Sequence, residues 1–247
     1  MKVIILVAGR GERLMPLTKN TPKSLLELGN GETILENQLN ALNKSGLQDV
    51  VLVLGYKAEQ VEAKIKDIKD FNIKVVYNPF YDITNNLVSA WMAREAMKED
   101  FILLNGDVIF KHTVMKNLLP DEKEICMIID RKERYSEEDM KVVTKGDTVL
   151  EVSKKIAIER ANGESIGMIK FQGKGRHKFV TVIEEMVRSK ENLNLFYLSV
   201  IQKIIDDGFP VHYCECLLED WLEIDFHPDL RSLRNNIDRF SQIIKHW

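Results

Sequence analysis

The chain has 247 residues, of which 45% are hydrophobic, and its formal net charge is −3 at pH 7. This length fits one large α/β domain, with or without a small addition, and residues 1–247 are expected to form a single domain. The mild charge argues against a nucleic acid or a membrane surface as a partner. No apolar run is long enough to span a bilayer, and the N-terminus enters a strand without the features of a signal peptide.

The cysteines are few and odd in number: Cys126, Cys214 and Cys216. Cys126 lies in an apolar run and is expected to be a buried core thiol. Cys214 and Cys216 alternate along a strand-like stretch and therefore share one face. Two cysteines without well-placed histidines give little support for a metal site. A reduced, cytoplasmic protein is the simplest interpretation.

The first element in chain order is an apolar run over 3–7, which predicts a buried strand, and a loop with two glycines follows it. Gly9 and Gly11 permit positive φ and leave no Cβ between the backbone amides and a ligand, and successive amides in such a turn form an anion site. Basic residues close to this loop can supply counter-charge: Arg10, Arg13 and Lys23. The segment therefore favours polyphosphate binding over a plain strand-to-loop turn.

Strands and helices alternate after this loop. The expected elements are a helix over 33–45, a strand over 49–54, a helix over 56–69, a strand over 71–77, a helix over 87–97 and a strand over 101–104. This order predicts an α/β fold in which a mostly parallel, Rossmann-like sheet lies between layers of helices. Such sheets bind ligands at the carboxyl ends of their strands, where the glycine loop and Asp107 are both expected.

The second half of the chain is less regular. It contains expected strands over 125–130, 163–171 and 211–215, a hairpin over 141–143 and 148–153, an extended segment over 221–225, and helices over 179–189, 195–207 and, as a polar tail, 229–245. An acidic loop over 133–139 precedes the hairpin. The sequence contains no internal repeat or low-complexity linker that would mark a domain boundary.

Carboxylates in two segments could hold a metal. Asp107 ends an apolar strand and faces the phosphate loop, whereas Glu223 and Asp225 point to one face of an extended segment. Mg²⁺ usually takes one or two protein carboxylates and completes its shell with water and phosphate, so Asp107 and Asp225 would suit it. The structural alternatives are a turn aspartate for Asp107 and a helix N-cap for Asp225.

Other polar and aromatic residues have two interpretations each. Asn86 and Ser89 are expected either to cap a helix or to read the edge of a nucleobase. Lys141 is either a surface lysine or a cleft residue that neutralises an attacking phosphate. Aromatic residues near acidic ones are more often core or rim residues, but a cluster of them could hold a quaternary ammonium: Tyr81, Tyr197, Trp221 and Phe226.

Taken together, the motifs resemble a known family. Ala8-Gly9-x-Gly11-x-Arg13-Leu14-x-Pro16-Leu17-Thr18 with Pro22-Lys23 resembles the signature of the nucleoside-triphosphate transferases that make nucleotide-sugars and CDP-alcohols. Later segments are similar to the bacterial phosphocholine cytidylyltransferase branch: Asn85-Asn86-x-x-Ser89, Gly106-Asp107, Asp139-Met140-Lys141-Val142, Gly163-Glu164-Ser165-Ile166-Gly167 and Trp221-x-Glu223-Ile224-Asp225. The resemblance implies a GT-A-like nucleotidyltransferase fold with a small acceptor-binding insert at about 131–175. Residues 145–175 could support a homodimer.

The resemblance also implies an activity and a set of site residues. The activity is Mg²⁺-dependent transfer of a cytidylyl group from CTP to a small phosphorylated or phosphonate acceptor, of the phosphocholine or 2-aminoethylphosphonate type, with release of pyrophosphate. The implied nucleotide-binding residues are Leu6, Ala8, Gly9, Gly11, Asn86, Ser89 and Gly106. The implied catalytic residues are Arg13 at the β- and γ-phosphates, Lys23 at the α-phosphate and Lys141 at the acceptor phosphate or the pentavalent centre. Asp107 and Asp225 would ligate Mg²⁺, and the acceptor pocket would include Glu164, Trp221 and Glu223.

Three alternative functions stay open. A sugar-1-phosphate nucleotidyltransferase would use UTP or dTTP, although such enzymes usually carry a longer sugar-binding region than this chain leaves. A non-catalytic nucleotide-binding regulatory protein would keep the fold, but the presence of Lys23, Asp107 and Asp225 argues against it. A guanylyl or cytidylyl transfer of the molybdopterin type is the third alternative.

Overall fold

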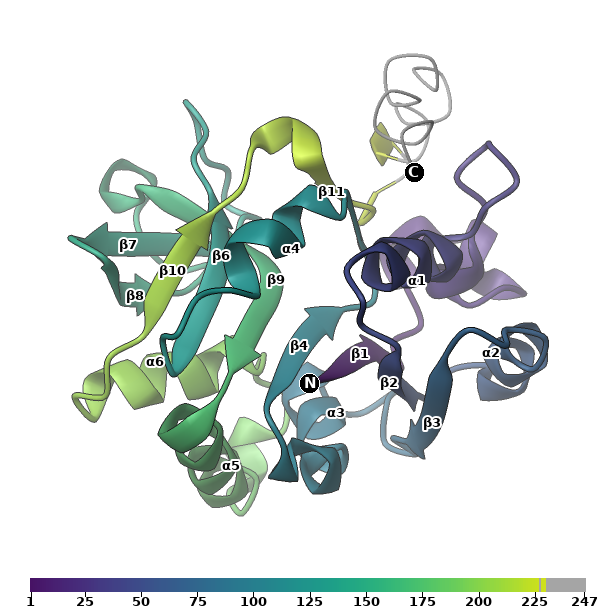
Figure 1. Cartoon of the computed structure of the whole chain (residues 1–247), viewed down its shortest axis with the longest axis horizontal. Helices are drawn as coiled ribbons and strands as arrows, with labels where there is room; N and C mark the ends of the chain where they lie inside the picture. Colours follow the sequence, from purple (N-terminus) through teal and green to yellow (C-terminus); the bar gives the residue numbers. More distant parts are fainter. Residues whose placement is uncertain (227, 230–247) are drawn as a thin grey trace.

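A computed structural model describes residues 1–226 and 228–229 of the chain, and this part forms a nine-stranded sheet in the order β3-β2-β1-β4-β9-β6-β10-β8-β7 (Figure 1). Its strands are β1 (Lys2–Val7), β2 (Asp49–Leu54), β3 (Asn72–Tyr77), β4 (Phe101–Asn105), β6 (Ile125–Asp130), β7 (Lys141–Lys145), β8 (Thr148–Val152), β9 (Gly163–Phe171) and β10 (His212–Glu215). A separate short sheet pairs β5 (Val108–Phe110) with β11 (Trp221–Glu223).

The half of the sheet built by the first hundred residues is parallel, as predicted. β1 pairs in parallel with β2 on one side and with β4 on the other, and β3 continues the sheet beyond β2. Residues 3–7 of β1 and residues 50–54 of β2 are buried without interruption. Such continuous apolar runs are typical of parallel strands that are covered on both faces.

The other half of the sheet is mixed, which corrects the expectation of a mostly parallel sheet there. β9 runs antiparallel between β4 and β6, β10 is parallel to β6, and β7 and β8 form the predicted hairpin at the edge. β9 is reached through a hairpin rather than a crossover helix, and this connection reverses its direction. The segment 131–175 therefore contributes β9 to the centre of the sheet as well as the hairpin at its edge.

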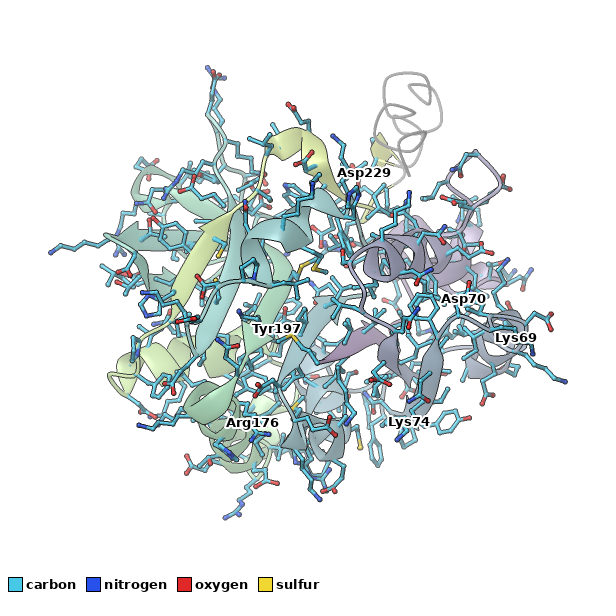
Figure 2. All side chains as sticks on the ribbon, in the orientation of Figure 1. Lys69, Asp70, Lys74, Arg176, Tyr197 and Asp229 are labelled. Carbon is cyan, nitrogen blue, oxygen red and sulfur yellow. The ribbon has the colours of Figure 1, made fainter. Side chains whose placement is uncertain are left out.

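Helices cover both faces of the sheet, as predicted. They are α1 (Ile34–Lys44), α2 (Ala58–Ile65), α3 (Asn86–Met92), α4 (Thr113–Leu118), α5 (Gly173–Met186) and α6 (Leu198–Asp206). One face packs on α1, α2 and α4, and the other packs on α3, α5 and α6. None of the helices in the described part of the chain is long and apolar enough to cross a membrane. Lys69, Asp70 and Lys74 lie at the periphery, whereas Tyr197 lies inside (Figure 2).

Several helix boundaries differ from the sequence prediction. α1 begins where Thr33 and Glu36 form a capping box, close to the expected start. The helix predicted over 56–69 is limited to α2, and the one predicted over 87–97 is α3 followed by a 3₁₀ turn (Arg94–Lys98). α5 starts six residues before the predicted start of 179, because Gly175 lets the helix approach the backbone of Glu124: a Cβ at Gly175 would lie 2.3 Å from the Glu124 carbonyl oxygen. The predicted tail over 229–245 lies almost entirely outside the described residues.

Phe171→Ala tests the apolar packing between β4, β9 and α5. The Phe171 ring centroid lies 4.7 Å from that of Phe101 and 4.5 Å from that of Phe179, and all three rings are fully buried. We expect this substitution to lower the free energy of unfolding by about 3–5 kcal/mol in urea denaturation, because it leaves a cavity. Phe80, which is 47% exposed, is the matched control, and Phe80→Ala should change stability by less than about 0.5 kcal/mol. An equal loss of unfolding free energy in Phe171→Ala and Phe80→Ala would contradict the prediction.

Candidate active site

A cleft of about 390 Å³ opens at the carboxyl ends of β1 and β4. Several segments that are far apart in the sequence line it, and four of them carry most of the predicted site residues. The loop after β1 contributes Gly9, Gly11, Arg13 and Lys23; the end of β4 contributes Asn105, Gly106 and Asp107; β9 contributes Glu164, Ser165, Ile166 and Gly167; and the segment from β11 contributes Trp221, Glu223 and Asp225. The predicted meeting of the glycine loop and Asp107 at one edge of the sheet is therefore confirmed.

The Lys23 ammonium lies between two carboxylates in this cleft. Its Nζ is 2.9 Å from Asp107 Oδ2 and 3.0 Å from Asp225 Oδ1, and Arg13 Nη1 is 2.5 Å from Asp225 Oδ2. Burial acts to lower the pKa of Lys23, but the charges of Asp107 and Asp225 outweigh it and raise that pKa. Burial acts to raise the pKa of Asp225, but the charges of Lys23 and Arg13 hold it below its ordinary value. The residues thus form a charged network of two cations and two carboxylates.

The pairing of β5 with β11 brings Asp225 to this place. Trp221, Leu222 and Glu223 lie opposite residues 108–110, and the amide of Ile224 donates to the carbonyl of Asp107 at 2.9 Å. Asp107 accepts this hydrogen bond and Asp225 directly follows its donor, Ile224, so the bond brings the two aspartates together. The sequence predicted both carboxylates but contained no signal for this strand pairing.

Two glycines are required by the backbone around the cleft. Gly11 has a φ of 63°, and its carbonyl accepts a hydrogen bond from Thr18 Oγ1 at 2.8 Å. A Cβ at Gly106 would lie 2.3 Å from Val7 Cγ1, so only glycine lets the end of β4 approach β1 this closely. Gly9 has open space around the position of a Cβ, which leaves its backbone accessible to a ligand.

The carboxylates have the chemistry of a divalent cation site. Asp107 Oδ1 is buried and has no hydrogen-bond partner among the described residues, while its other oxygen accepts from Lys23. A buried carboxylate oxygen without a partner is costly, and a hard cation with oxygen ligands would satisfy it. Asp107 and Asp225 therefore fit the role of metal ligands.

The residues predicted for the acceptor also line the cleft. Trp221 Nε1 donates to the buried carboxylate of Asp130 at 2.9 Å, which orients the indole ring. Glu164, on β9, forms an ion pair with Lys132, and Lys132 Nζ also lies 3.0 Å from Asp139 Oδ2. Burial outweighs the attraction of Lys132 and raises the pKa of Glu164 to about 7.

Two further residues line the cleft that sequence reasoning did not single out. Lys154 Nζ and Arg13 Nη1 both contact Glu138 Oε2, at 3.3 Å and 3.2 Å, and Lys154 also lies over the Phe196 ring. Lys154 and Glu138 lie on exposed loops of mixed charge, and no spacing pattern distinguishes them from surface residues. Their place in the cleft follows from the tertiary fold.

Some of the predicted site residues do not present their side chains to the cleft. Lys141 is fully buried, and its Nζ donates to the backbone carbonyls of Ser136 at 3.0 Å and Glu137 at 3.3 Å. Ser89 is buried and accepts from Asn78 Nδ2 at 3.0 Å. Asn86 lines the cleft, but its Oδ1 accepts from the amide of Tyr197 at 2.8 Å.

Two predicted backbone contributors, Leu6 on β1 and Ala8 just after it, differ in their surroundings. Leu6 lines the cleft, whereas Ala8 is buried and its carbonyl accepts from the amide of Tyr56 at 2.9 Å. Of the predicted aromatic residues, Trp221 lines the cleft and Tyr197 is fully buried.

Comparison with known proteins identifies the family. The model of the family described as "Nucleotidyl transferase" matches residues 2–235. The chain belongs to this family. It is similar to the CTP:phosphoglutamine cytidylyltransferase of Campylobacter jejuni, with 28% identity over 93% of this chain and 98% of that protein. It is also 32% identical to the choline-phosphate cytidylyltransferase of Streptococcus pneumoniae, over 48% of this chain and 50% of that protein.

Solved structures confirm the fold. The CTP:phosphocholine cytidylyltransferase of Streptococcus pneumoniae matches with a TM-score of 0.78 and 23% identity, over 96% of this chain and 98% of that one. The inositol-1-phosphate CTP transferase of T. maritima matches with a TM-score of 0.80 and 22% identity, over 96% of each chain. The mixed α/β sheet with helices on both faces is thus the nucleotidyltransferase fold predicted from the motifs.

Glu164→Gln tests the burial of this carboxyl group. The pKa of Glu164 is about 7 in the folded protein, against about 4.3 in an unfolded chain. At pH values between these two, the folded state therefore binds more protons at Glu164 than the unfolded state does. The contribution of Glu164 to the stability of the wild type should therefore fall as pH rises through this window, by at most about 1.4 kcal/mol per pH unit, and the difference between wild type and variant should show this dependence. Urea unfolding between pH 4.5 and 7 would measure it, with the exposed Glu133→Gln as control. Parallel pH profiles for wild type and Glu164→Gln would contradict the prediction.

Proposed function

We propose that this protein is a Mg²⁺-dependent cytidylyltransferase that joins CTP to a small phosphorylated or phosphonate acceptor and releases pyrophosphate. The observation that carries the proposal is the Lys23 ammonium between Asp107 and Asp225, beside a glycine loop at the carboxyl ends of β1 and β4. This arrangement combines a backbone suited to anions, positive charge and a pair of carboxylates suited to a metal in one cleft.

The choice of CTP rests on the relatives. The similar proteins of Campylobacter jejuni and Streptococcus pneumoniae are both named as cytidylyltransferases, and the first of them aligns along nearly its whole length. Asn85 and Asn86 line the cleft, and their amide groups are suited to the edge of a base. The backbone of Leu6, Gly9 and Gly106 would complete the nucleotide site.

The proposed reaction is an in-line displacement at phosphorus. An anionic oxygen of the acceptor attacks the α-phosphorus of CTP, a new phosphorus–oxygen bond forms, and the bond to the pyrophosphate oxygen breaks. The attacking oxygen is already ionised, so no general base is required. Mg²⁺, held by Asp107 and Asp225, would neutralise phosphate charge when bound.

Positive side chains of this chain would supply the remaining stabilisation. The mutual repulsion of the two anions is the main obstacle, and Lys23 and Arg13 would offset it at the triphosphate. Lys154 lines the cleft, and its Nζ contacts Glu138, so it would meet the acceptor phosphate. Lys141, whose ammonium holds the loop at residues 136–139, would act by positioning that loop.

The acceptor wall favours a small acceptor that carries a polar or cationic group. Glu138, Glu164 and Glu223 contribute carboxylates there, and Trp221 and Phe196 contribute aromatic surface. Carboxylates and aromatic rings both attract an ammonium group. The compounds in the names of the two cytidylyltransferases above, phosphoglutamine and choline phosphate, both combine a phosphorus group with a nitrogen-containing one.

A pyrophosphate-release screen tests the proposal. CTP, UTP, dTTP and GTP would each be combined with Mg²⁺ and a panel of phosphocholine, 2-aminoethylphosphonate, small phosphorylated amides and sugar 1-phosphates. We expect release with CTP and at least one of the nitrogen-containing acceptors. Release only with UTP or dTTP and a sugar 1-phosphate would establish the sugar-nucleotide alternative. Thermal stabilisation by CTP without any release would instead indicate a regulatory nucleotide-binding protein.

Lys23→Ala should lower the turnover number about 10²–10³-fold, because it removes a charge that stabilises the transition state at the α-phosphate. The measurement is the steady-state rate of pyrophosphate release at saturating CTP. Lys19→Ala is the matched control, since Lys19 is an exposed lysine on the same loop. A Lys23→Ala variant that keeps the wild-type rate would refute the assignment.

A further inference from the structure

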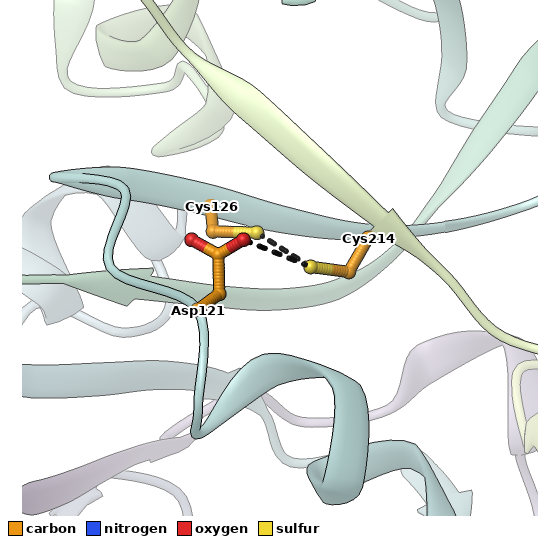
Figure 3. Close-up of side chains that lie close together, drawn as sticks. All are labelled: Asp121, Cys126 and Cys214. Carbon is orange, nitrogen blue, oxygen red and sulfur yellow. Dashed lines mark hydrogen bonds between the residues drawn. The ribbon is translucent and has the colours of Figure 1, made fainter. Parts of the chain in front are cut away.

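A second cluster of potential ligands lies outside the cleft. Asp121 precedes β6, Cys126 lies on β6 and Cys214 lies on β10 (Figure 3). The two sulfur atoms are 2.9 Å apart, and Cys214 Sγ is 3.8 Å from Asp121 Oδ2. One ligating atom from each residue lies within 4.8 Å of the other two. None of the three residues lines the nucleotide cleft.

The strand register disfavours a disulfide between these cysteines. Cys126 lies opposite His212, and Cys214 lies opposite Ile128, so the two cysteines are diagonal neighbours two residues out of register. In this parallel pair, an offset of two residues at about 3.3 Å each and a strand spacing of about 4.8 Å put the two Cα atoms roughly 8 Å apart, whereas disulfide-linked Cα atoms are usually about 4.4–6.8 Å apart. An ion bound to both sulfurs at about 2.3 Å in tetrahedral geometry would hold them roughly 3.8 Å apart, so the cysteine side chains would rotate to separate them from 2.9 Å.

A buried lysine next to the cluster points to negative charge there. Lys170 is fully buried and lies directly opposite Cys126, and its Nζ donates to the backbone carbonyl of Asp121. It has no salt bridge within the described part of the chain. A buried ammonium without a counter-charge is costly, and thiolates at Cys126 and Cys214 would provide that counter-charge.

We propose that Asp121, Cys126 and Cys214 form a site for a thiophilic divalent cation of the Zn²⁺ type. Two thiolates and one carboxylate match the ligand preference of Zn²⁺, whose bonds to sulfur and oxygen are about 2.3 Å and 2.0–2.2 Å. The ligands carry three negative charges, which the cation and Lys170 together neutralise. The carbonyl of Asn117, 3.5 Å from Cys214 Sγ, or water would occupy the fourth position, because Asp121 and Cys214 are only partly buried.

The consequence of binding is structural. The ion would connect the turn before β6 to β10, and the chain leaving β10 leads within a few residues to β11 and Asp225. Binding replaces the thiol protons and adds its free energy to the stability of the folded state. The site acts independently of the nucleotide reaction and does not rest on it.

Cadmium titration of the full chain tests this site. Protein stripped with a chelator and reductant would be titrated with Cd²⁺ in excess Mg²⁺, which keeps the carboxylates of the cleft occupied. We expect a thiolate-to-cadmium absorption band that saturates at one ion per chain, and a raised melting temperature with Zn²⁺. Asp121→Asn and Cys214→Ser should each weaken binding at least about tenfold.

Cys216→Ser is the matched control, because Cys216 lies just past β10 but outside the cluster. It should bind like the wild type. Asp121 is partly exposed, so Asp121→Asn keeps the test informative if a cysteine variant folds poorly, which circular dichroism would reveal. Absence of the charge-transfer band, its equal loss in Cys216→Ser, or spontaneous loss of two thiols as a disulfide without metal would overturn the proposal.

Discussion

The cleft depends on one electrostatic constraint, which is that two carboxylates must share one lysine. Asp107 and Asp225 come from segments more than a hundred residues apart, and their charges would repel each other at this separation without Lys23 between them. Burial opposes the charge of Lys23, yet the two carboxylates more than compensate and raise its pKa. The four charged groups of Arg13, Lys23, Asp107 and Asp225 therefore form one coupled network.

Backbone geometry makes this network possible. The short pairing of β5 with β11 carries Asp225 to Asp107, and the absence of a Cβ at Gly106 lets the end of β4 lie against β1. The left-handed backbone at Gly11 turns the loop so that Lys23 reaches the same place. These backbone features bring the charges together in one place, and electrostatic stabilisation depends on charges that are already oriented.

The acceptor side of the cleft is organised by buried ionic groups rather than by an aromatic cage. The ammonium of Lys141 holds the loop at residues 136–139, and Lys132 connects that loop to Glu164. Asp130 orients Trp221 from beneath. A fold can host different substrates, so the shared fold identifies the reaction class more readily than the acceptor.

The sequence by itself determined the buried strands of the first half, the glycine loop and the two carboxylates, because apolar runs and a dense cluster of glycine and basic residues are local signals. It also predicted β9 correctly over its whole length. Only the tertiary structure decided that β9 runs antiparallel. It also decided that Lys141 is buried while Lys154 faces the cleft. Cys214, finally, lies beside Cys126 and not beside Cys216. The physical reason is that strand direction and side-chain surroundings depend on which distant segments pack together, and no local pattern of residues records that choice.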